Sequence, residues 1–118
     1  MLNALVLAAA VAFTPNMALQ HARAIIESAL AQGGAAQFRH MELRASGERM
    51  AFCGEVNTRD ADGVLSGWKQ VMILVSPNPN LRAVVVGHGR DQREMIRSQC
   101  GAGVLLNHRD YSAALSVF

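Results

Sequence analysis

The sequence predicts a small α+β domain in which an N-terminal helix, an antiparallel sheet of about four strands and a C-terminal helix pack together. Three observations predict this fold class. Apolar residues recur at helical spacing between positions 15 and 32. Four strand-like runs follow between positions 37 and 86, and a second helical segment begins after position 89. Residues rich in glycine, proline and aspartate separate these segments.

The composition is that of one folded domain. Hydrophobic residues make up 51% of the 118 residues and charged residues 17%, which argues against disorder. A chain of this length forms a single core and is small enough to gain from a covalent crosslink. The formal charge is only +2, the basic residues are scattered, and the few aromatic residues form no series for base stacking. We therefore expect no nucleic-acid partner.

Residues 1–13 are expected to be the apolar segment of a signal peptide. Residues 2–13 carry no charge and are too short to span a bilayer, which takes about 20 residues. Ala10 and Ala12 form a small-x-small cleavage pattern at the end of the run. No Lys or Arg precedes it, so we expect the natural start a few codons upstream; the alternative is a buried N-terminal strand or helix. The mature protein is then residues 14–118, a single domain with no stable membrane span.

The first helix is predicted to begin at Thr14 and Pro15, as N-cap and first helical residue. Gly33-Gly34 is the predicted stop. Between these signals, residues such as Leu19 and Ile26 recur at helical spacing, which predicts an amphipathic helix that packs one face on a core.

The strand-like runs occupy residues 37–45, 48–57, 68–75 and 81–86. In the second run, Met50, Phe52 and Val56 share one face, and Cys53 shares the other face with Glu55 and Asn57. The third run, from Trp68 to Val75, is apolar on both faces, which is typical of a central strand covered on both sides.

The second helix is predicted to follow Gly89. Asp91 and Glu94 are spaced as a capping box, and Gly101 is placed as a C-terminal cap. Met95, Ile96 and Cys100 are expected to face the sheet. Residues 104–118 mix both patterns and receive no assignment.

The two cysteines, Cys53 and Cys100, match no zinc pattern and no Cys-x-x-Cys motif. A disulfide and two unrelated buried thiols both fit this spacing, and the cellular compartment decides between them. Cys53 as a nucleophile, with His40 or His88 as its base, is a weaker hypothesis because nothing in the spacing brings these residues together.

The run Phe52-Cys53-Gly54-Glu55-Val56-Asn57, followed by Gly63 and Gly67-Trp68, resembles a motif of small uncharacterised bacterial envelope proteins and lipoproteins. The resemblance covers about residues 36–100 and includes Ala36-Gln37-Phe38-Arg39. It brings no established activity. The chain departs from the pattern at Gly33-Gly34 and has no lipobox cysteine after its apolar start, so we expect no lipid anchor.

With the apolar start, this resemblance implies a Cys53–Cys100 disulfide and a periplasmic or secreted protein. The disulfide would hold the C-terminal helix on the Cys53 face of the hairpin. The opposite face, with Met50, Phe52 and Val56, would then be free for the N-terminal helix.

Glu55, Asn57 and Trp68 are predicted to form a polar cluster of functional or structural importance. The structural interpretation of Glu55 is an ion pair with an arginine such as Arg39 or Arg49, or a hydrogen bond to the adjoining loop. No metal or cofactor is expected. Asp60-Ala61-Asp62-Gly63 resembles half of a calcium loop, but the twelfth position of that loop would be Lys69, so we expect a hairpin turn built from Asp and Gly. Gly87-His88-Gly89 lacks the third glycine of a dinucleotide fingerprint, and the four histidines have no ligand spacing.

The sequence contains no convergent catalytic set, so the leading hypothesis is a non-catalytic periplasmic or secreted module that binds a protein partner in the envelope. Two alternatives stay open. One is a small periplasmic hydrolase that uses Glu55 with a histidine, which requires both in one pocket. The other is an inhibitor of an envelope enzyme, which would display the loop at residues 60–67.

Overall fold

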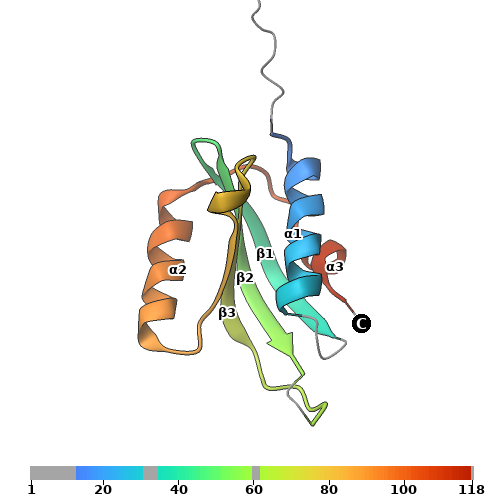
Figure 1. Cartoon of the computed structure of the whole chain (residues 1–118). Coiled ribbons are helices and arrows are strands. Elements are labelled where there is room, and N and C mark those ends of the chain that lie inside the picture. Colours follow the sequence, from blue (N-terminus) through green and yellow to red (C-terminus); the bar gives the residue numbers. More distant parts are fainter. Residues whose placement is uncertain (1–12, 31–34, 60–61, 118) are drawn as a thin grey trace, which may run out of the picture.

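The computed structural model describes residues 13–30, 35–59 and 62–117 and has the predicted α+β architecture. An antiparallel sheet has the strand order β4-β3-β2-β1-β5. Its strands are β1 (Ala36–Ser46), β2 (Arg49–Thr58), β3 (Lys69–Val75), β4 (Ala83–Val86) and β5 (Val104–Leu105). The helices are α1 (Pro15–Ala29), α2 (Arg90–Ala102), α3 (Ser112–Leu115) and a short 3-10 helix, η1 (Pro79–Leu81). Figure 1 shows α1 and α3 on one face of the sheet and α2 on the other.

Helix α1 begins where the sequence predicts. The Thr14 hydroxyl accepts a hydrogen bond from the Met17 amide (3.2 Å), and Pro15 is the first helical residue. The buried side chains Ala18, Ala22 and Ile26 form the stripe that faces the sheet. The predicted stop at Gly33-Gly34 and the expected signal segment up to position 12 lie outside the described residues.

Two cores lie on opposite faces of the sheet, and β3 contributes to both. Val71, Ile73 and Val75 pack in the larger core with α1 and α3, whereas Met72 packs in the smaller core under α2. The prediction that this strand is central and covered on both sides is therefore confirmed. Phe52 and Val56 of β2 face α1, also as predicted.

A β-bulge interrupts the pairing of β1 with β2. Arg39 lies opposite Glu55 and Glu42 lies opposite Cys53, so both His40 and Met41 face Gly54. His40 adopts the left-handed conformation with φ of 57°. The extra residue turns Met41 into the same core as Phe38, although the two positions are an odd number of residues apart.

The C-terminal segment, which the sequence left unassigned, completes the sheet and the larger core. Strand β5 pairs with β1, and Val117 forms a bridge with Ala36. Tyr111 and Leu115 are buried beside α1. These elements are too short to show a periodic pattern, and they are held in place by β1.

Helix α2 corrects three predictions, which concern its capping box, its C-terminal cap and the side chain of Met95. Its N-cap is Gly89, no side chain caps it, and Asp91 already lies in the first turn, so the predicted capping box is wrong. Glu94 instead accepts a bond from Arg90 one turn earlier (3.2 Å). The helix continues past Gly101 to Ala102, with Gly103 as its C-cap. Met95 is exposed whereas Ile96 is buried, because adjacent helical residues point about 100° apart.

Within the described ranges, no helix is both long enough and apolar enough to cross a membrane.

Candidate functional site

The two cysteines form a disulfide between β2 and α2. The Cys53–Cys100 bond has a Cα–Cα distance of 6.3 Å, and it holds α2 over the Cys53 face of the sheet as predicted. Neither cysteine is a free thiol. The hypothesis of a Cys53 nucleophile is therefore wrong for this structure, because a disulfide sulfur carries no thiolate.

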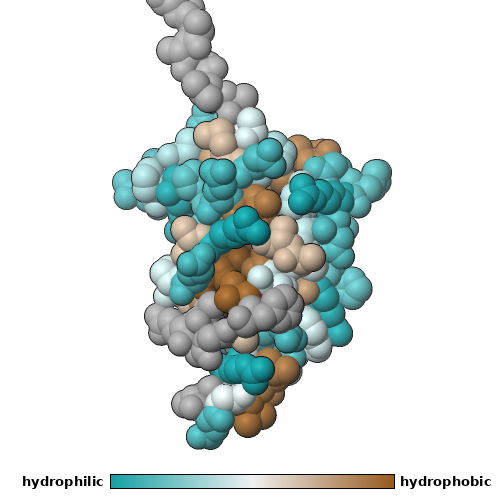
Figure 2. Space-filling model, turned by 90° about the vertical axis from the view of Figure 1, so that its right-hand side faces the viewer, coloured by the Kyte–Doolittle hydropathy of each residue, from teal (hydrophilic) through white to brown (hydrophobic). Residues whose placement is uncertain are grey.

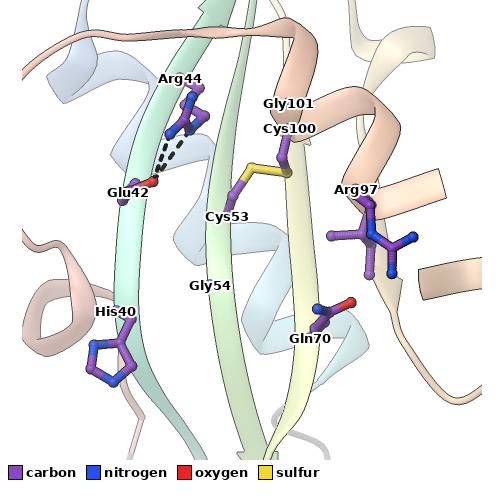
Figure 3. Close-up of a pocket in the computed structure, with 10 residues that line it drawn as sticks. His40, Glu42, Arg44, Cys53, Gly54, Gln70, Arg97, Cys100 and Gly101 are labelled. Atoms are coloured by element: carbon purple, nitrogen blue, oxygen red, sulfur yellow. Dashed lines mark hydrogen bonds and ion pairs between the residues drawn. A yellow bond between two sulfur atoms is a disulfide. The ribbon is translucent and has the colours of Figure 1, made fainter. Parts of the chain in front are cut away.

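An open cavity of about 450 Å³ lies beside this disulfide, between α2 and the outward side chains of β1. We call it the α2–β1 cavity. Figure 3 shows His40, Glu42 and Arg44 on one side and Arg97 on the other, with the disulfide between them. Gly54, Gln70 and Ile96 also line it. No sequence pattern predicts this cavity, because its residues come from four elements that only the fold brings together.

The charges of the α2–β1 cavity do not cancel. Arg44 and Glu42 form an ion pair at 3.0 Å, and Arg44 also donates to the Gly103 carbonyl (3.2 Å). Arg97 forms no ion pair with any residue in the described part of the chain. One positive charge therefore remains uncompensated at the cavity.

The predicted cluster of Glu55, Asn57 and Trp68 lies on the same face of the sheet, toward the loop between β2 and β3. Arg39 Nε and Glu55 Oε1 are 2.7 Å apart, and the Arg39 guanidinium lies 4.2 Å from the centre of the Trp68 ring. This contact matches the structural interpretation of Glu55. Glu55 does not line the α2–β1 cavity, and its carboxylate is bonded to an arginine rather than to a histidine.

Asn57 organises the β2–β3 loop. Its side chain is nearly buried, and its Oδ1 accepts a hydrogen bond from the Gly67 amide (3.0 Å). The Ser66 amide also donates to the Thr58 carbonyl (2.9 Å), and Arg59 donates to the Gly63 carbonyl (2.7 Å). These bonds fix the backbone on either side of residues 60–61, which are outside the described ranges.

Three large apolar side chains are exposed in this loop. Val64, Leu65 and Trp68 are 59%, 38% and 36% exposed, and we call them the loop patch. The loop extends beyond the helices at the lower end of the molecule in Figure 1, and hydrophobic surface is visible at the same end in Figure 2. Trp68 precedes β3 rather than beginning it, which leaves its side chain in the loop.

Sequence reasoning missed the role of Asp110. Its carboxylate accepts hydrogen bonds from the Ser112 hydroxyl and amide and from the Met41 amide at the bulge. These bonds, chiefly the one from the Ser112 side chain, hold the pKa of Asp110 below its usual range. A second, smaller cavity of about 230 Å³ lies here, lined by His40, His108 and Asp110 among others. The described residues contain no group of histidines, cysteines and carboxylates placed to hold a metal ion.

Comparisons with protein-family models, with curated proteins and with solved structures find no match to this chain.

Proposed function

We propose that this protein is a non-catalytic module, exported to the periplasm or secreted, that binds a protein partner of the cell envelope through its β2–β3 loop. The observation that carries the proposal is the loop patch. Exposed valine, leucine and tryptophan side chains in one short loop are typical of a surface that another protein covers.

The part of the loop that leads into β3 is held in place by hydrogen bonds. Hydrogen bonds from Ser66 and Gly67 to Thr58 and Asn57 fix its return toward β3. A preorganised loop loses little conformational entropy when it binds, so more of the contact energy contributes to affinity.

Trp68 and Arg39 add the residue types that dominate binding energy at interfaces. Arg39 stacks on the Trp68 ring and is held there by Glu55. The predicted cluster of Glu55, Asn57 and Trp68 then acts as the support of a binding surface rather than as catalytic machinery.

The disulfide supports export, because such bonds persist in the periplasm and outside the cell and are rare in the cytosol. The expected signal segment adds the second argument for the same compartment. Mass spectrometry of periplasmic protein, with thiol alkylation before and after reduction, tests it: export predicts a shortened N-terminus and no thiol before reduction.

Capture from a bacterial envelope extract tests the binding surface. The protein is immobilised as the wild type, as a Leu65→Ser variant and as a Val104→Ser control. Val104 is 69% exposed. It lies in β5, which is an edge strand of the sheet, and not in the β2–β3 loop. Removing a central apolar contact weakens binding by about tenfold or more.

We expect the partner retained by the wild type to be lost with Leu65→Ser and kept with Val104→Ser. Equal retention by all three proteins would contradict the assignment of the loop patch. If the partner is an envelope enzyme and its activity falls on binding, the protein is an inhibitor. The protruding loop is compatible with that second function.

A further inference from the structure

The proposed partner surface leaves the α2–β1 cavity without a role. We propose that this cavity is a separate binding site for a small carboxylate that carries an apolar group beside its carboxyl group. The inference is independent of the loop patch, because the two features share no residue.

The size and lining of the cavity suit such a ligand. Its volume of about 450 Å³ lies in the range of small-molecule sites, roughly 300–1,000 Å³. Ile96 and the Cys53–Cys100 disulfide form the apolar part of the cavity lining. Ile96 and Cys53 are both nearly buried. An apolar group would contact these atoms.

The charge of the cavity selects an anion. Glu42 is neutralised by Arg44 at 3.0 Å, whereas the guanidinium of Arg97 has no acidic partner in the described ranges. Guanidinium and carboxylate groups match in geometry and form two parallel hydrogen bonds. Arg97 is therefore the residue that would hold the carboxyl group.

Gln70 supplies a second polar group. Its side-chain amide lines the cavity, and no hydrogen bond of this amide is present within the described part of the chain. Figure 3 shows Gln70 below the disulfide, with Arg97 to its right and His40 across from both. The amide can donate to the ligand carboxylate or to an adjacent carbonyl.

The test is a titration of the ¹⁵N-labelled, oxidised protein followed by two-dimensional NMR. The probe is N-acetyl-leucine, and its neutral analogue N-acetyl-leucinamide is the control of the same shape. We expect saturable shifts at the amides of Gly54, Gln70 and Gly101 with a dissociation constant in the millimolar range, as befits so small a ligand. The neutral amide should bind about tenfold more weakly.

Arg97→Gln is the decisive variant, and Arg93→Gln, on the same helix but outside the cavity lining, is its matched control. We expect Arg97→Gln to weaken the acid about tenfold and to leave binding of the neutral amide unchanged, while Arg93→Gln changes neither. A well-dispersed spectrum shows that each variant is folded.

Equal binding of acid and amide, equal effects of the two variants, or shifts that do not map to the cavity would each overturn the proposal. A short peptide ending in leucine distinguishes two sources of the same chemistry. Binding much tighter than N-acetyl-leucine identifies a peptide C-terminus, and equal binding identifies a small free carboxylate. The Leu65→Ser variant, which alters the loop patch, should bind N-acetyl-leucine and the peptide as the wild type does. This outcome would separate the cavity from the proposed partner surface.

Discussion

Gly54 is the residue on which the bulge of β1 depends. Two residues of β1, His40 and Met41, lie opposite Gly54, and this extra residue forms the bulge. A Cβ atom at this position would lie 2.5 Å from Met41 Sδ, 2.6 Å from the His40 carbonyl oxygen and 2.8 Å from the Arg39 carbonyl oxygen. Because two of these contacts are with backbone, rotation of a side chain cannot relieve them.

We expect Gly54→Ala to lower the free energy of unfolding by about 1–3 kcal/mol, the usual effect of overpacking. Gly101→Ala is the control, since Gly101 is helical and a Cβ there meets no atom within 4 Å. Alanine also favours the helix by about 1 kcal/mol over glycine, so the control should be neutral or stabilising. Urea unfolding followed by circular dichroism measures both, and an unchanged midpoint for Gly54→Ala would refute the steric account.

Arg39 and Glu55 illustrate a contact with more geometric than energetic importance. Their side chains are 45% and 34% exposed, so solvent screens the ion pair and it contributes at most about 1 kcal/mol. Its effect is to hold the guanidinium over Trp68, which orients a side chain of the loop patch.

At the scale of elements, the turn before α3 is fastened to the bulge of β1. The Tyr111 amide donates to the Met41 carbonyl (3.0 Å), and the Asp110 carboxylate accepts from the Met41 amide (3.3 Å). Both polar groups of one bulge residue are thereby satisfied by a segment distant in the sequence. The bulge and the C-terminal segment therefore depend on each other.

This contact should make stability depend on pH. The pKa of Asp110 is lowered in the folded protein, above all by the Ser112 hydroxyl, while an aspartate in the unfolded chain titrates near about 3.9. The stabilisation by Asp110 is therefore fully present above the unfolded pKa and is lost as the pH falls through the folded pKa. Because Asp110 is exposed, we expect an effect below about 1 kcal/mol.

Urea unfolding of the wild type and Asp110→Asn at pH 7, 5 and 3 measures this contribution. The wild type should be the more stable at pH 7, and the difference should begin to shrink once the pH falls below the unfolded pKa, because protonation of Asp110 then removes its charge first in the unfolded chain. A difference that stays constant with pH would show that the charge of Asp110 does not contribute.

At the scale of the whole molecule, the disulfide joins the layer formed by α2 to the sheet. Among the described residues, the smaller core under α2 contains few buried side chains, namely Ala51, Cys53, Met72 and Ile96. The crosslink closes a sequence separation of 47 residues, for which chain entropy gives a stabilisation of about 4 kcal/mol. That is a large part of the net stability of a small domain.

We expect the double variant Cys53→Ala/Cys100→Ala to lose roughly 3–4 kcal/mol of unfolding free energy relative to the oxidised wild type. The reduced wild type should lose a similar amount, which controls for the substitutions. Hydrogen exchange should then increase first in α2, whose remaining contact with the sheet is a small core. Equal stability with and without reductant would show that packing alone holds α2.

The sequence by itself determined the parts of this protein that depend on local patterns. The Thr14-Pro15 start of α1 follows from capping chemistry, and the alternation in β2 assigns Phe52 and Cys53 to opposite faces of the sheet. The two apolar faces of β3 required a layer on each side of it. Periods of 3.6 and 2 residues express burial directly, so they can be read without any tertiary structure.

Only the tertiary structure decided the bulge, the place of residues 104–117 and the α2–β1 cavity. The bulge needs the close approach of Met41 to Gly54, and α3 is a single short turn held by the core around Tyr111. The cavity joins Glu42 to Arg97 across strands and a helix. Each of these features depends on contacts between residues far apart in the chain, and such contacts leave no periodic pattern in the sequence.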